Sequence, residues 1–166
     1  MKLRLARVAR HGAARTASTL GLLVLGAATV PPGQAAPKAP PPPAYVAACQ
    51  SCHKADGSGV PGVFPRIAGR MGSAAQSAAG RKWMIANLIF GQSGAIEVDG
   101  KPIRGIMPAF ARLSDAQIAE VLNWISAGQG KPFTAGEVAS VRAQPGMNPA
   151  KVGQMRAELA KAGVIK

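Results

Sequence analysis

Residues 45–53 read YVAACQSCH, and this stretch places two cysteines and a histidine close together: Cys49, Cys52 and His53. On a helix, residues at positions i, i+3 and i+4 lie on one face. We therefore expect a helix over residues 44–54 that directs two thiols and one imidazole at the same group.

Two cysteines at this spacing are typical of a zinc site, a redox dithiol or a haem attachment site. Structural zinc needs about four Cys or His ligands, but the sequence after residue 36 contains only these two cysteines and this histidine. A thioredoxin-like dithiol follows a strand of a βαβ unit, whereas here PPPPAYVAA precedes the motif. The CxxCH pattern is the signature of c-type haem attachment. It predicts one covalent haem c, with thioethers at Cys49 and Cys52 and with His53 on the iron.

A second axial ligand then has to be methionine, because no second histidine remains. The candidates after residue 36 are Met71, Met84, Met107, Met147 and Met155. Met107 stands apart, because Gly105 and Pro108 in RGIMPAF predict an irregular loop that can turn its thioether inward. A hairpin over AIEVDGKPI, with Asp99-Gly100 as its turn, is predicted just before it.

Four segments in this order resemble class I c-type cytochromes: YVAACQSCH, GVPGVFPRIAG, GIMPAF and LSDAQIAEVLNWI. The resemblance covers residues 44–127. It implies an all-α class I cytochrome c fold with a short β-hairpin and a single haem ligated by His53 and Met107. It also implies outer-sphere electron transfer, not enzymatic catalysis.

The resemblance implies further roles near the cofactor. The Pro65 carbonyl is expected to accept a hydrogen bond from the His53 ring, which orients that ligand. Tyr45 is expected to pack against Trp124 of the closing helix. Arg66 and Arg70 either meet the haem propionates or are solvated, since surface arginine is common. Trp83 either reaches a propionate or packs with a satisfied donor.

Local patterns predict the remaining helices. The apolar run at residues 81–90 predicts a buried helix. Ser114 and Gln117 form a capping box for the closing helix, which Gly128 ends. Its buried stripe is Ile118, Val121, Leu122 and Ile125.

Residues 131–166 form an extension that the minimal cytochrome fold does not require. Thr134 with Glu137 is a second capping box, and Asn148 followed by Pro149 predicts a further helix start. We therefore predict two extra C-terminal helices, which pack on the domain or on a partner.

The N-terminal residues 1–36 are typical of a secretory signal, with five basic residues followed by an uncharged run over residues 16–30. That run is shorter than the roughly 20 residues of a membrane-spanning helix. Cleavage after Ala35 or Ala36 and export to the periplasm are expected; an uncleaved membrane anchor is the alternative. A Pro-rich linker at 37–43 and a cytochrome domain at 44–130 follow.

Charge bears on the partners. Removing residues 1–36 leaves 15 Lys and Arg against 7 Asp and Glu, a net charge of +8. Such a surface favours a redox partner with an acidic docking surface, with Lys54, Arg104 and Arg112 as candidate contacts. Export and the scarcity of aromatic residues disfavour nucleic acid. Two functions are expected: a periplasmic electron shuttle, or a haem subunit of an exported quinoprotein-type dehydrogenase.

Overall fold

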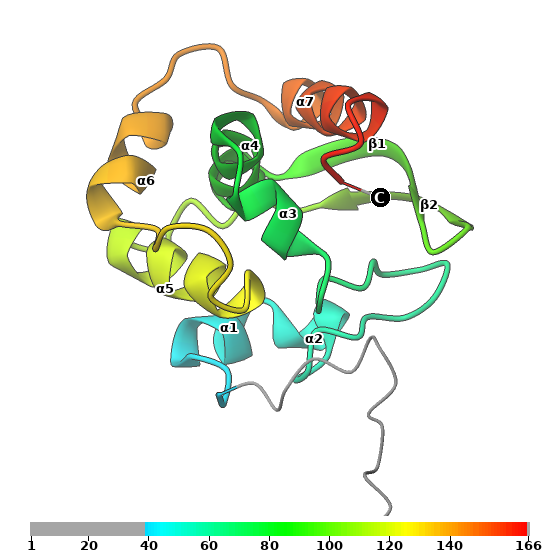
Figure 1. The fold of residues 1–166 in the computed structure, drawn as a ribbon, viewed down its shortest axis with the longest axis horizontal. Coiled ribbons are helices and arrows are strands. Elements are labelled where there is room, and N and C mark those ends of the chain that lie inside the picture. Colours follow the sequence, from blue (N-terminus) through cyan, green and yellow to red (C-terminus); the bar gives the residue numbers. More distant parts are fainter. Residues whose placement is uncertain (1–38, 166) are drawn as a thin grey trace, which may run out of the picture. The chain divides into compact units, whose positions relative to one another are not determined.

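The computed structural model describes residues 39–165, so the predicted signal peptide lies outside the described residues (Figure 1). The described helices are α1 (Pro43–Ala48), α2 (Gln50–His53), α3 (Met71–Ala75), α4 (Ala78–Phe90), α5 (Asp115–Ile125), α6 (Ala135–Arg142) and α7 (Pro149–Lys161). A hairpin of β1 (Gln92–Val98) and β2 (Lys101–Met107) separates α4 from α5. The predicted helical fold with one short hairpin and two extra C-terminal helices is confirmed.

The haem-motif helix differs from the single helix predicted over residues 44–54. It is divided at Cys49, whose backbone dihedrals are φ −116° and ψ −32°. It ends at His53, because Lys54 has the left-handed φ of 64°. The hydrogen bonds from Cys49 N to Tyr45 O (2.8 Å) and from His53 N to Cys49 O (2.9 Å) continue across the division. The three motif side chains therefore keep their helical spacing.

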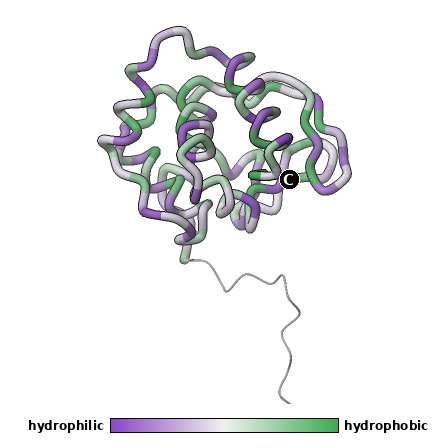
Figure 2. Tube along the Cα trace, turned by 45° about the horizontal axis from the view of Figure 1, so that its top comes forward, coloured by the Kyte–Doolittle hydropathy of each residue, from purple (hydrophilic) through white to green (hydrophobic). Residues whose placement is uncertain are grey.

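Helix α4 lies between α6 and α7 (Figure 1) and packs against α3, α5, α6 and α7. Ser77 caps its start by accepting a hydrogen bond from Gly80 N at 3.0 Å. Most of its side chains are buried, as the apolar run predicted. In Figure 2, hydrophilic and hydrophobic residues alternate along the helices of this domain, as expected for elements with one buried face. Within residues 39–165, the structure contains no helix that combines the length and apolar character needed to cross a membrane.

The hairpin is longer than predicted, and the irregular loop expected around Met107 is wrong. Asp99 (φ 53°) and Gly100 (φ 72°) form its turn, as the Asp-Gly pair predicted. The segment around Met107 is not an irregular loop, because β2 continues through Gly105 to Met107 and Met107 pairs with Gln92. A tight turn with φ > 0 at both central residues matches the strand twist, so the ladder continues until Pro108 ends it.

Helix α5 begins as predicted. Ser114 Oγ accepts from Gln117 N at 3.2 Å, and Ser114 N donates to Gln117 Oε1 at 2.9 Å. The predicted stripe is buried, and the Trp124 ring lies against Tyr45 of α1 with centroids 4.4 Å apart. This contact joins the closing helix to the helix that carries the haem motif.

The two extension helices pack on the domain. Thr134 and Asn148 cap their starts through side-chain oxygens. The predicted capping box at Thr134 is only half formed, because the Glu137 carboxylate binds Arg81 and not Thr134 N. Helix α6 lies against α5 and α4, and α7 lies against β1 and α4. A partly buried ion pair holds the first of them: Arg81 of α4 binds Glu137 through Nε–Oε1 (2.7 Å) and Nη2–Oε2 (2.5 Å). The same guanidinium lies 3.8 Å from the Phe133 ring centroid.

Candidate functional site

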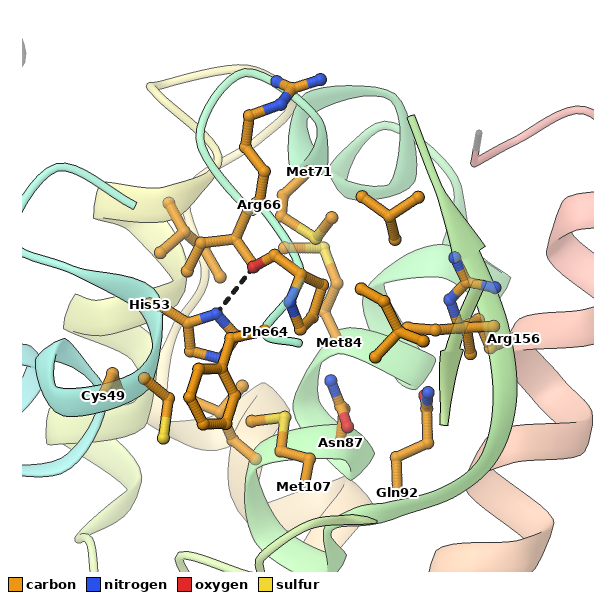
Figure 3. Close-up of a pocket in the computed structure, with 18 of the residues that line it drawn as sticks. Cys49, His53, Phe64, Arg66, Met71, Met84, Asn87, Gln92, Met107 and Arg156 are labelled. Atoms are coloured by element: carbon orange, nitrogen blue, oxygen red, sulfur yellow. Dashed lines mark hydrogen bonds between the residues drawn. The ribbon is translucent and has the colours of Figure 1, made fainter. Parts of the chain in front are cut away.

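A largely apolar cavity lies between the CxxCH motif, the loop after it, α4, the hairpin and the C-terminal extension (Figure 3). Cys49, Cys52, His53 and Met107 all line it. The sequence-predicted cysteine and histidine ligands therefore share one cavity with the methionine that comes 54 residues after His53 in the sequence.

Both cysteines are free thiols, with Cys49 buried and Cys52 half-buried. Burial raises the pKa of Cys49 to about 11, and the neighbouring Cys52 adds to this shift. A redox dithiol needs a cysteine with a lowered pKa, because the thiolate is the reactive form. The environment of Cys49 therefore does not suit thiol–disulfide exchange. It is compatible with a sulfur that forms one permanent covalent bond.

His53 is held in the form that a metal ligand requires. The residue is 7% exposed, and its Nδ1 donates to the Pro65 carbonyl oxygen at 2.9 Å. Burial lowers the pKa of His53 and outweighs the opposing effect of this hydrogen bond. The imidazole is therefore neutral near pH 7 with Nδ1 protonated, which leaves the Nε2 lone pair available for a metal.

Gly59 positions the Pro65 carbonyl, a role that the sequence interpretation missed. Its N–H donates to His53 O at 3.1 Å. A Cβ at this position would lie 2.5 Å from Phe64 O and 2.7 Å from Pro65 O, and φ is +66°. Only glycine combines that dihedral with so close an approach.

Three methionines line the cavity: Met71, Met84 and Met107. Met84 is fully buried among core side chains. In the view of Figure 3, Met107 lies on the side of the His53 ring away from the Pro65 hydrogen bond, whereas Met71 lies on the carbonyl side. Met147 and Met155 do not line the cavity. The geometry thus favours Met107 among the five candidates.

Comparison with known proteins bears on this site. A model of the cytochrome c family matches residues 43–129. The chain belongs to the cytochrome c family. Its cofactor is accordingly a covalent haem c, and it is an electron-transfer protein and not an enzyme. The resemblance to class I c-type cytochromes is confirmed.

Three relatives of this cytochrome are informative. Cytochrome c-552 of Thermus thermophilus is 42% identical over 106 residues, which cover 59% of this chain and 81% of the relative. A second Thermus thermophilus cytochrome c-552 is also 42% identical over 106 residues, which cover 59% of this chain and 72% of that protein. The gluconate 2-dehydrogenase cytochrome c subunit of Pantoea cypripedii is 34% identical over 103 residues, which cover 59% of this chain but 23% of the subunit.

The cavity of this cytochrome fits haem in two respects: the donor atoms that line it and the apolar character of the rest of its lining. Two thiols, an imidazole and the Met107 thioether line one cavity, and the rest of its lining is largely apolar. Asn87 Oδ1 is buried at this wall without a hydrogen-bond partner. A buried acceptor without a hydrogen bond is costly, so Asn87 Oδ1 needs a partner that the protein atoms of the cavity do not supply.

Among the polar residues of the site, Trp83 follows one of its two expected alternatives, Arg66 follows neither of its own, and two others were missed. Trp83 Nε1 donates to Gln92 Oε1 at 2.9 Å, so its donor is satisfied within the protein. Arg66 pairs with Asp99 at 2.8 Å in the hairpin turn, and Arg70 lines the cavity. Asn87 was not predicted, although a lone amide within the apolar run WMIANLIF was a signal for it. Arg156 was also missed, because its approach to the cavity depends on how α7 packs.

Proposed function

We propose that this cytochrome is an exported monohaem electron carrier in which Cys49 and Cys52 form the two thioether bonds. His53 and Met107 are its axial iron ligands. The observation that carries this proposal is the hydrogen bond of 2.9 Å from His53 Nδ1 to the Pro65 carbonyl, in the same cavity as Met107. Pro65 belongs to the cofactor site through this hydrogen bond.

The proposed ligands favour outer-sphere electron transfer. Haem held by histidine and methionine supplies one-electron redox chemistry and leaves no coordination position for a substrate. The chain's apolar residues exclude water from the cavity, which favours the reduced state. Because the haem completes the core of a small domain, it also contributes to folding.

We propose that the redox partner docks at the exposed edge of the cavity. Val63, Phe64 and Ile106 line the cavity and are also exposed, Ile106 by 75%. Lys54, Arg104 and Arg112 are exposed cations. Exposed apolar side chains at the cavity and exposed cations on the surface suit a transient complex with an acidic redox partner.

The segment boundaries are part of this proposal. Residues 1–36 are a cleaved signal that directs the protein to the periplasm, and residues 37–43 are a linker. Residues 44–130 are the cytochrome domain, and residues 131–166 are an extension that completes it. The mass of protein isolated from the periplasmic fraction tests the cleavage: we expect a chain that begins after Ala35 or Ala36, and a full-length chain in the membrane fraction would contradict it.

The carrier function is tested by a potentiometric titration of the purified haem protein. We expect a reversible one-electron transition at positive potential and haem that stays on the chain in a denaturing gel. Haem that separates from the chain in the gel would contradict the thioether assignment. Rapid binding of external ligands to the iron would contradict closed axial coordination.

A second candidate function is that of a haem subunit bound to an exported dehydrogenase. It is supported by the 34% identity to the gluconate 2-dehydrogenase cytochrome c subunit. Affinity purification from periplasm distinguishes the two functions. A dehydrogenase recovered in equal amount supports the subunit, whereas a monomer in gel filtration supports the shuttle.

A further inference from the structure

Arg156 brings a charged side chain from the C-terminal extension into the haem cavity. It lies on α7, beyond residues 43–129 that match the family. It is 9% exposed and lines the cavity, and Figure 3 draws it across the pocket from His53. The family pattern therefore does not account for this residue.

The Arg156 guanidinium lacks an acidic partner within residues 39–165. Its hydrogen bond there runs from Nη2 to the backbone oxygen of Glu97 at 3.1 Å. The ion pairs in this part of the chain use Arg66, Arg81 and Arg142 instead. A buried charge is costly unless it is paired, so this arginine lacks the anion that its burial requires.

Arg70 adds a second cation on the same cavity. Burial is the main cause that lowers the pKa of both arginines, and repulsion from Arg70 lowers that of Arg156 further. At Arg70 the attraction of Asp99 offsets part of the shift, and repulsion from Arg66 adds to it. Arg66 is already bound to Asp99 through two hydrogen bonds of 2.9 and 2.8 Å. Arg156 and Arg70 are thus two desolvated cations that a shared anion would stabilise.

The fold holds Arg156 in place. A Cβ on Gly153 would clash with Ser93 O, so the α7 backbone lies directly against β1. Ser73 Oγ donates to Val164 O at 2.7 Å, and the next residue, Ile165, is buried and lines the cavity. Because these contacts hold both α7 and the segment that follows it, the guanidinium is positioned before any ligand binds.

We propose that Arg156, together with Arg70, forms an anion site that binds a carboxylate of the haem. This inference rests on the proposed haem site, since the propionates are the anionic groups that the cofactor brings into the cavity. Arginine suits this role because its planar fork can donate two hydrogen bonds to one carboxylate. The C-terminal extension would therefore be a part of the cofactor site and not only a covering.

The test is the pH dependence of the midpoint potential of the holoprotein in wild type, R156Q, R156K and K151Q. Lys151 lies exposed on the same helix, so K151Q removes the same charge away from the cavity. The charged side chains that line the cavity besides Arg156 are Arg66 and Arg70, apart from the neutral His53. Asp99 is held by Arg66, and the exposed Glu97 gives Arg156 its backbone oxygen.

A cation within a few ångströms lowers a carboxyl pKa by about 1–3 units. We therefore expect R156Q to raise the pKa of a haem carboxyl by about 1 unit or more, and to lower the potential at neutral pH. The lowering follows because an uncompensated carboxylate stabilises ferric iron. R156K should restore most of the wild-type profile, and K151Q should match wild type.

The proposal would be overturned if the pH dependence of the midpoint potential were the same in R156Q as in wild type and K151Q. It would also be overturned if R156K changed that dependence as much as R156Q does. Haem content and the methionine–iron absorption band are recorded for each variant. If the wild-type protein lacks the haem or the methionine–iron band, the proposed haem ligation is wrong. If both persist in R156Q and the profile does not change, only the anion site fails. Should R156Q not accumulate, the same profile is measured for R70Q, with the same shift expected.

Discussion

His53 Nδ1 and the carbonyl oxygen of Pro65, twelve positions apart in the sequence, are joined by a 2.9 Å hydrogen bond. The bond fixes both the tautomer and the orientation of the imidazole. It also depends on Gly59, whose missing side chain leaves room for the Pro65 carbonyl. A ring, a carbonyl and a glycine thus act together to present Nε2 to the cavity.

Gly59→Ala should weaken this arrangement. We expect a loss of about 2 kcal/mol or more in unfolding free energy, since both the positive φ and the contact with Pro65 O are violated. The midpoint potential should rise, because an imidazole that donates a weaker hydrogen bond is a less basic ligand and stabilises ferric iron less.

Gly62→Ala is the matched control for this prediction. Gly62 has a similar φ of +77°, but nothing lies within 4 Å of the Cβ that alanine would add. It should lose only the backbone cost of about 1 kcal/mol and keep the wild-type potential. Equal effects of the two variants would show that the Pro65 contact is unimportant.

Cys49→Ala with Cys52→Ala should prevent the accumulation of folded holoprotein. The cavity would then lack its covalently held cofactor, and a small domain with a vacant centre has a marginal core. Far-UV circular dichroism and haem staining measure the result. Ser51→Ala, at the exposed residue between the two cysteines, should behave as wild type. A red, folded double variant with haem that resists denaturation would speak against the assignment.

Glu137→Gln should destabilise the protein by about 2 kcal/mol at neutral pH, because it leaves the 4%-exposed Arg81 without its carboxylate. Hydrogen bonds from Arg81 are the main cause that lowers the pKa of Glu137. A lowered folded-state pKa gives stability that is present above the ordinary glutamate pKa and lost as the pH falls through the lowered value.

The measurement is chemical unfolding of wild type and Glu137→Gln at several pH values. The difference between them should shrink as the pH falls below the ordinary glutamate range. Glu120→Gln, at an exposed position on α5, should cost little at any pH. A difference between wild type and Glu137→Gln that stays constant down to strongly acidic pH would rule out the ion pair as its source.

The basic surface predicts salt-dependent association. Charge reversal at Lys54, Arg104 or Arg112 should reduce the association rate with an acidic redox partner several-fold at low salt, with a smaller effect at high salt. Stopped-flow kinetics at two ionic strengths checks this. Charge reversal of Lys161, the last residue of α7, serves as the comparison, and an equal effect there would indicate net charge and not a docking surface.

Local signals explain what could be predicted from sequence. The capping box at Ser114, the N-cap at Thr134 and the Asn148 N-cap each depend on residues three positions apart, so the starts of α5, α6 and α7 were predictable. The Asp99-Gly100 turn was equally local. Counting cysteines and histidines was sufficient to predict the cofactor, because no other metal-binding set was available.

Tertiary contacts explain what was missed. The extension of β2 to Met107 depends on pairing with Gln92, and the role of Gly59 depends on the return of the loop to Pro65. Arg156 looked like an ordinary helix-surface cation in the sequence. Only the packing of α7 against β1 turns its side chain toward the cavity.

The absorption band of sulfur-to-iron charge transfer in the oxidised holoprotein tests the central claim, ligation by His53 and Met107, most directly. We predict that the band is present in wild type, lost in Met107→Ala and retained in Met71→Ala, whose methionine lines the same cavity. Met107→Ala should also have a lower midpoint potential and bind external ligands. A band that persists in Met107→Ala, or that disappears in Met71→Ala alone, would contradict the assignment.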